Sequence, residues 1–175
     1  MRIGKFVLAC RYPAFMSLAT GGPSSLVVAR VAHAQWFFVN LYEAVVRMPD
    51  RLADGHDGRT SGSGPFASGS PARYHLPAVP VVLGSTVAAL VRARRDEDNR
   101  AALVLAATCS LSAFGLTGYL VRRVNLRLLD GGAPLKAGER HALVNRWYRV
   151  NRVRLALLAV GSIAYECAAQ RRRAG

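Results

Sequence analysis

The chain has 175 residues, of which 51% are hydrophobic and 19% charged, and its mean hydropathy is +0.16. This apolar content is high for a soluble domain, and the formal net charge of +14 comes mainly from arginines clustered between apolar segments, a pattern typical of membrane flanks. Zinc-finger spacing, a basic helix interleaved with aromatic residues and a long lysine-rich tail are absent from the sequence, which argues against nucleic-acid binding and makes the lipid bilayer the predicted partner.

The chain begins with a lead-in, residues 1–23, in which Arg11 interrupts an apolar stretch after five residues. Five residues are too few for the core of a signal peptide, so we predict no cleaved signal and expect a surface or interfacial segment. A membrane domain is predicted over residues 24–170, followed by a basic tail at residues 171–175.

Four apolar segments are predicted to cross the membrane as helices. The first, residues 25–48, has 24 residues and exceeds the roughly 20 that a bilayer core requires, whereas the second, residues 76–91, has 16. The third, residues 101–121, has 21 residues without a charge, and the fourth covers about residues 153–169. The sequence therefore predicts an all-α bundle of four transmembrane helices, a multi-pass protein of the cell membrane.

The connections between these segments differ in character. Residues 54–73 contain five Gly, four Ser and two Pro, which predicts an irregular loop or lid between the first two helices. The third connection, residues 122–152, is long enough for a short extra helix beginning near residues 136–139. Arginine clusters at residues 92–100 and 171–173 share a side with the N-terminus and predict cytoplasmic termini, if the arginines of the third connection serve a site instead.

Polar side chains follow one face of the first segment. His33, Asn40 and Glu43 lie at helical spacing, with Arg30 and Arg47 on the same stripe near the helix ends. A charge facing lipid near a helix centre costs about 2.5–3.5 kcal/mol, so the stripe is predicted to face protein or water. Two interpretations stay open: hydrogen bonds that fix the packing of the helices, or a functional site.

A second polar set flanks the third connection. Asn125 follows the third segment, and Trp147, Asn151 and Arg154 lie at positions i, i+4 and i+7 where the last segment begins. An aromatic belt with basic anchors would give a similar pattern, but asparagine is a poor interfacial anchor. We therefore predict that this set converges with the stripe of the first segment on one cavity near one membrane face. Because a buried arginine needs a partner, Glu43 is the predicted counter-ion of Arg154.

The stretch RWYRVNRVR at residues 146–154, the asparagine in RRVNLRL and the four apolar segments resemble the anthrone oxygenase-like family of small four-helix membrane proteins. In that family the third helix runs into Asn-x-Pro-x-Asn, and the fourth begins with Arg-Trp, then His or Asn, then Val-Arg. The resemblance covers about residues 25–168, although Leu-Arg-Leu-Leu at residues 126–129 replaces the family's Pro and second Asn. The matching positions are Asn125, Arg146, Trp147, Asn151, Val153 and Arg154.

The resemblance implies an oxygenase that oxidises an anthrone-type aromatic polyketide, or a similar lipophilic small molecule, with dioxygen as co-substrate. An anthrone enolate reacts with dioxygen directly, so one base and one oxyanion partner suffice. His33 is the expected base, since the unperturbed pKa of histidine is about 6.5, with Glu43 or Asn40 to orient it. The expected substrate-binding residues are Asn125, Trp147, Asn151 and Arg154.

No cofactor is inferred from the sequence. His33, Glu43 and His75 lack the spacing of a metal site, and the chain contains no GxGxxG or Walker pattern. Two other functions stay open: a non-catalytic membrane scaffold or subunit, and a small permease or lipid-binding protein. The sequence leaves the oligomeric state open.

Overall fold

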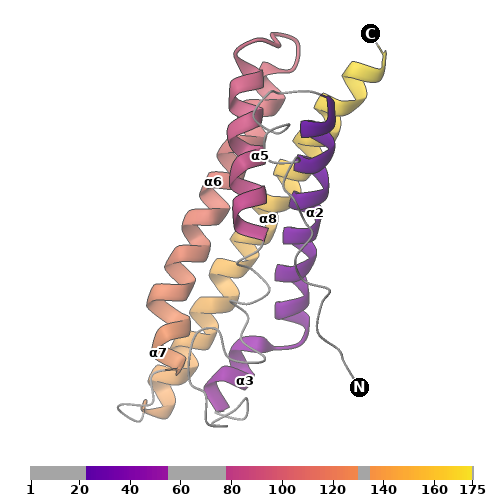
Figure 1. Cartoon of the computed structure of the whole chain (residues 1–175). Coiled ribbons are helices and arrows are strands. Elements are labelled where there is room, and N and C mark those ends of the chain that lie inside the picture. Colours follow the sequence, from indigo (N-terminus) through magenta and orange to yellow (C-terminus); the bar gives the residue numbers. More distant parts are fainter. Residues whose placement is uncertain (1–22, 55–77, 130–134, 175) are drawn as a thin grey trace, which may run out of the picture.

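A computed structural model describes residues 23–54, 78–129 and 135–174, and all of its secondary structure in those ranges is helical (Figure 1). The all-α prediction is therefore confirmed for these ranges. The predicted loop at residues 55–73 and residues 1–22 of the predicted lead-in lie outside them. The elements are α2 (Pro23–Val45), α3 (Met48–Asp54), α5 (Ala78–Ala93), α6 (Arg100–Leu120), the π-helical turn η1 (Val121–Asn125), α7 (Leu126–Leu129) and α8 (Ala137–Ala174).

The long helices α2, α5, α6 and α8 lie side by side and alternate in direction (Figure 1). Helix α8 packs against α6 and α2, and α5 packs against the same two neighbours of the bundle, α6 and α2. Helix α5 is the shortest of them, with 16 residues, and accompanies the others over only part of their length. At the end of the molecule away from α5, the short elements α3, η1 and α7 surround the beginning of α8. We call this the α3–α7 end.

The observed helix ends differ from the predicted ones most at α8, whose apolar segment was predicted to begin near residue 153, and at the end of α2. The predicted short helix near residues 136–139 is wrong as a separate element, because α8 runs unbroken for 38 residues from Ala137. Its buried residues Leu143, Trp147, Asn151 and Arg154 keep helical spacing, and no proline interrupts them. The first helix ends at Val45 rather than at residue 48. Arg47, with a φ of 55°, adopts the left-handed conformation there, and α3 starts with the next residue.

Small residues allow α6 and α8 to approach each other closely. Ala106 and Ala113 on α6 are fully buried. Opposite them, a Cβ atom added to Gly161 of α8 would lie 3.3 Å from the Cβ of Cys109 and 3.6 Å from the carbonyl oxygen of Ala106. Close contact between backbones at small residues is typical of helix pairs in membranes.

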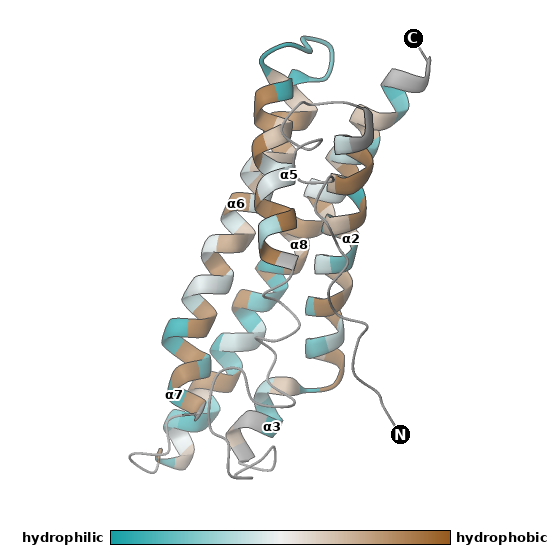
Figure 2. Ribbon diagram, viewed as in Figure 1, coloured by the Kyte–Doolittle hydropathy of each residue, from teal (hydrophilic) through white to brown (hydrophobic). Residues whose placement is uncertain are grey.

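Large apolar side chains are also exposed on the outside of the long helices. Figure 2 shows hydrophobic residues along α2, α5 and the later part of α8, and hydrophilic residues at the beginning of α8 and in the turn between α5 and α6. Two helical stretches, Arg100–Leu128 and Ala137–Arg171, are long and apolar enough to cross a bilayer, and Val79–Ala93 is a shorter apolar helix. Helix α2, the first of the four predicted spans, is not among them. Examples of the exposed side chains are Val31, Phe38, Val45, Val87, Leu111, Val153 and Ile163.

Candidate functional site

A buried arginine lies at the centre of a polar cluster between α2, α6 and α8. The Nε and Nη2 atoms of Arg154 both donate to Oδ1 of Asn151, at 3.0 and 2.6 Å, and Nη1 donates to Oγ1 of Thr117 at 3.3 Å. Arg154 is 3% exposed and Asn151 1% exposed. The guanidinium group is therefore held from two sides, by an amide one turn earlier on its own helix and by a hydroxyl from α6.

Glu43 of α2 supplies the negative charge. Its Oε2 lies 3.4 Å from Nη2 of Arg154, so the predicted pairing of these two residues is confirmed. The exposed fraction of the Glu43 side chain is 14% and that of Arg154 is 3%, so the carboxylate lies on the more accessible side of the pair. An ion pair so nearly removed from solvent needs further hydrogen bonds to offset its desolvation, and Asn151 and Thr117 provide them.

Asn40 completes the cluster on the α2 side. Its backbone oxygen accepts a hydrogen bond of 3.4 Å from Nδ2 of Asn151, and its own Nδ2 donates to the carbonyl oxygen of Trp36 at 2.6 Å. Its Oδ1 is buried and has no hydrogen-bond partner in the described part of the chain. A buried acceptor without a donor is a place where a ligand can bind. We call these five residues the Arg154 cluster: Asn40, Glu43, Thr117, Asn151 and Arg154.

Helix α6 contributes polar side chains that the sequence-based site did not include. Its inward face repeats at steps of three and four residues and is apolar except for two hydroxyl residues, the buried Ser110 and the half-buried Thr117. Thr117 also donates to the carbonyl oxygen of Ala113 at 2.9 Å, which fixes its side chain. The signal for both hydroxyls was present in the sequence, as polar interruptions of an otherwise apolar helical stripe.

His33 lies apart from the Arg154 cluster. Its Nδ1 is 3.2 Å from the carbonyl oxygen of Ala29, and its Nε2 is 2.5 Å from Oγ of Ser110. The imidazole is fully buried, and the ring of Tyr165 lies edge-on at a centroid distance of 4.8 Å. His33 is seven residues from Asn40, about 10 Å along the axis of α2. The structure therefore does not bring His33 into the cluster, and both of its nitrogens already have partners.

Asn125 and Trp147 also lie outside the cluster. Trp147 is 3% exposed and packs in an apolar group with Leu120, Val124 and Leu143. Asn125 ends the π-helical turn, and its Oδ1 is buried without a partner in the residues that the structure covers. Val124 precedes Asn125, so Asn125 and Trp147 share the α3–α7 end, as predicted. Of the predicted site residues, Asn40, Glu43, Asn151 and Arg154 are brought together.

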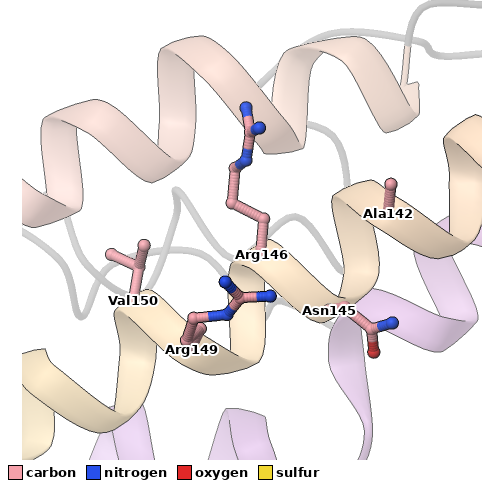
Figure 3. Close-up of a pocket in the computed structure, with 5 residues that line it drawn as sticks. All are labelled: Ala142, Asn145, Arg146, Arg149 and Val150. Atoms are coloured by element: carbon pink, nitrogen blue, oxygen red, sulfur yellow. The ribbon is translucent and has the colours of Figure 1, made fainter.

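A surface hollow of about 350 Å³ lies along the beginning of α8, and its lining contains none of the predicted site residues (Figure 3). Its lining residues are Ala142, Asn145, Arg146, Arg149 and Val150. Among the residues placed by the structure, no three His, Cys, Asp or Glu side chains gather as metal ligands would. His75, which the sequence analysis considered with His33 and Glu43, lies outside those residues.

A family model described as Anthrone oxygenase matches residues 70–164, more than half of the chain. The matched region contains α5, α6 and most of α8, and therefore Thr117, Asn151 and Arg154 of the cluster, whereas α2, with Asn40 and Glu43, lies before it. No curated protein and no solved structure matches the chain.

Proposed function

The chain belongs to the anthrone oxygenase family, and from this premise we propose that it is an integral membrane oxygenase acting on a lipophilic aromatic ketone of the anthrone type with dioxygen as co-substrate. The observation that carries the proposal is the Arg154 cluster, in which a buried guanidinium group is paired with a half-buried carboxylate between apolar helices. Such groups are costly inside a membrane and are retained there mainly for function. A scaffold or a permease would not require both the carboxylate of Glu43 and the guanidinium group of Arg154 at this place.

In this proposal α2, α5, α6 and α8 form a four-helix transmembrane bundle. Residues 101–121 give a length of about 30 Å at 1.5 Å per residue, which matches the bilayer core. Helix α5 is included because it packs between α2 and α6. The outer face of α8 changes from the exposed Arg149 and Arg152 to the exposed Val153 and Val160, so one membrane boundary falls at residue 153. The Arg154 cluster then lies just inside that boundary.

The chemistry that we propose needs a base and a group that stabilises an enolate oxygen. Glu43 removes a proton from the ring carbon opposite the carbonyl of the anthrone, and the resulting enolate oxygen is stabilised by Arg154. The enolate carbon then reacts with dioxygen. One oxygen atom stays on that carbon as the new ketone and the other leaves as water, so one anthrone and one dioxygen give one anthraquinone and one water.

The hydrogen bonds of Arg154 support this division of roles. A guanidinium group has five N–H donors, and the bonds to Asn151, Thr117 and Glu43 use four of them. One Nη1 donor is left for a substrate oxygen. Asn151 and Thr117 do not need to touch the substrate, and we assign them as positioning residues. The free Oδ1 of Asn40 offers an acceptor to the same ligand.

The test of the proposal is a direct assay of the purified protein in lipid vesicles. With an anthrone supplied to the vesicles, we expect anthraquinone absorbance to increase faster than in vesicles without protein, with one dioxygen consumed per product in an oxygen electrode. The rate should saturate with anthrone concentration. Saturable binding of the anthrone without turnover would support the permease or lipid-binding interpretation instead, and neither binding nor turnover would support the scaffold.

A substitution at His33 distinguishes the two candidate bases. We expect His33→Leu to turn over at close to the wild-type rate and to lose about 1–3 kcal/mol of unfolding free energy, because it removes buried hydrogen bonds outside the cluster. Ser110 keeps its own bond to the carbonyl oxygen of Ala106, at 2.7 Å. The matched control is Ser110→Ala, which leaves the imidazole in place. A fall in turnover of about 100- to 10,000-fold in His33→Leu alone would return the role of base to His33.

A further inference from the structure

At the α3–α7 end, the exposed apolar surface of the long helices is bordered by exposed arginines. On α6 and η1, exposed Val121 is followed by exposed Arg122 and Arg123. On α8, exposed Arg152 immediately precedes exposed Val153. On α2, exposed Val45 is followed two residues later by Arg47. The transition from apolar to basic therefore occurs at a corresponding position on three helices. The arginine collar consists of Arg47, Arg122, Arg123, Arg146, Arg149 and Arg152, all of them exposed.

The side chains of the collar form no ion pair or side-chain hydrogen bond with the residues that the structure describes. Arg127, at the same end, is not part of the collar because it pairs with Glu139 at 3.2 Å. At the opposite end of the molecule several arginines are likewise neutralised by the protein itself. Arg30 pairs with Glu166, Arg92 with Asp96, and Arg100 with Glu97 at 3.3 Å. The positive charges of the collar are therefore available to an anion from outside the chain.

The depth of the collar matches the headgroup layer of a bilayer. With the boundary at residue 153, Arg149 lies about 6 Å and Arg146 about 10 Å beyond the hydrocarbon core, measured along α8. The polar layer on each side of a bilayer is about 5–8 Å thick. Arg149 and Arg152 thus lie at the depth of lipid phosphates, and Arg146 lies just outside it.

A hollow accompanies these charges. Arg146 and Arg149 come from neighbouring turns of α8 and line the cavity of about 350 Å³, with Asn145 beside them (Figure 3). The side chain of Arg146 extends away from α8, whereas that of Arg149 stays closer to the helix. Two guanidinium groups at one hollow can hold the oxygens of a phosphate by charge-assisted, bidentate hydrogen bonds.

We propose that the arginine collar binds the phosphate groups of anionic membrane lipids and that the hollow between Arg146 and Arg149 holds one such headgroup. The proposal rests on the membrane placement given above but not on the oxygenase reaction. It places anionic lipid at the same membrane face as the Arg154 cluster.

Thermal unfolding of the full chain in a neutral detergent tests the proposal. We expect added phosphatidylglycerol to raise the Tm by about 3–8 °C, because a ligand that binds only the folded state stabilises it. Phosphatidylcholine with the same acyl chains, and inorganic phosphate, should give little or no shift. The effect of phosphatidylglycerol should weaken in about 0.5 M salt, which screens exposed charges.

Matched variants locate the effect. Substitution of both Arg146 and Arg149 by Gln should remove more than half of the shift with phosphatidylglycerol. Substitution of both Arg94 and Arg95, which are exposed at the opposite end, should preserve it. Each double substitution removes two positive charges, so the two variants have the same net charge. Equal losses in the two double variants, equal shifts with phosphatidylcholine, or an equal shift with inorganic phosphate would overturn the proposal, the last by indicating a site for free anions.

A second measurement uses the unaltered protein, so it does not depend on the folding of variants. In vesicles that contain brominated phosphatidylglycerol among unbrominated phosphatidylcholine, we expect stronger quenching of tryptophan fluorescence than in vesicles with the bromine on phosphatidylcholine. Trp36 and Trp147 are the two tryptophans of the chain, and both are buried, so the quenching reports which lipid is enriched around the bundle. The double variants then assign that enrichment to the hollow. Equal quenching by the two brominated lipids would contradict selective binding. The thermal shift and the quenching can both be negative while the anthrone assay is positive, and both can be positive while the anthrone assay is negative. A failure of the lipid proposal is therefore distinguishable from a failure of the proposed oxygenase activity.

Discussion

Glu43→Gln is expected to lower anthrone turnover by about 100- to 10,000-fold, because the variant keeps the shape of the side chain but no longer accepts a proton. Glu43 is suited to this role by its place at the accessible edge of the cluster, where 14% of its side chain is exposed. The initial rate of anthraquinone formation per folded protein, in vesicles, measures the effect. Turnover near the wild-type rate would remove Glu43 from the chemistry.

The same substitution should also destabilise the protein. It leaves the guanidinium group of Arg154 buried without a counter-charge, for which we expect a loss of about 2–4 kcal/mol in unfolding free energy, somewhat below the usual cost because Glu43 is partly exposed. Combining it with Arg154→Met removes the unpaired charge. The double variant should therefore recover part of the stability and none of the turnover, which separates the structural effect from the catalytic one.

Glu166→Gln is the matched control. Glu166 pairs with Arg30 across the same two helices, α8 and α2, but outside the Arg154 cluster. The side chains of that pair are 30% and 38% exposed, so the loss of unfolding free energy should be below about 1 kcal/mol. Turnover should stay unchanged. If both glutamine variants lost turnover equally, the effect of Glu43→Gln would reflect the docking of α2 on α8 and not the chemistry.

Helical periodicity predicted which face of each helix is buried, and this was enough to pair Glu43 with Arg154. Glu43 lies near the end of the first apolar segment and Arg154 near the start of the fourth, predicted at about residues 153–169, and in a chain of alternating helices those ends are at the same level. An unpaired arginine at that depth is so costly that the nearest carboxylate is the expected partner. The prediction thus combined a face, a level and an energetic requirement, and the structure supports each of them.

Periodicity did not predict the partner of His33. The prediction that His33 lies on the buried face of its helix is confirmed, since the residue is fully buried. Its hydrogen bond to Ser110 on α6, however, depends on how the helices are rotated relative to each other. Single-helix patterns do not contain that rotation. For the same reason Trp147, assigned to the substrate site from its spacing, packs instead among Leu120, Val124 and Leu143. Spacing along the sequence thus predicts which face of a helix a residue lies on, but not which residues of the neighbouring helices it contacts.

Arg154→Lys is expected to lower turnover by about 100- to 1,000-fold while changing stability much less than Glu43→Gln, because it keeps the buried charge but loses the planar fork of donors. A lysine ammonium group cannot donate to Asn151 twice, to Thr117 and to Glu43 while a further donor stays free for the enolate oxygen. The comparison of turnover with unfolding free energy in the same vesicle preparation checks both parts of the expectation.

Chemical rescue makes this test specific for the guanidinium group. Arg154→Ala removes the side chain beyond Cβ, and free guanidinium ion at low millimolar concentration should restore part of its turnover, whereas ammonium ion should not. Arg30→Lys, in the partly exposed ion pair outside the cluster, is the control and should keep full turnover in the absence of any additive. Full activity of Arg154→Lys would mean that a positive charge alone is sufficient at this position. Asn151 and Thr117 would then be packing partners of the helices, and the orientation of the guanidinium group would have no part in catalysis.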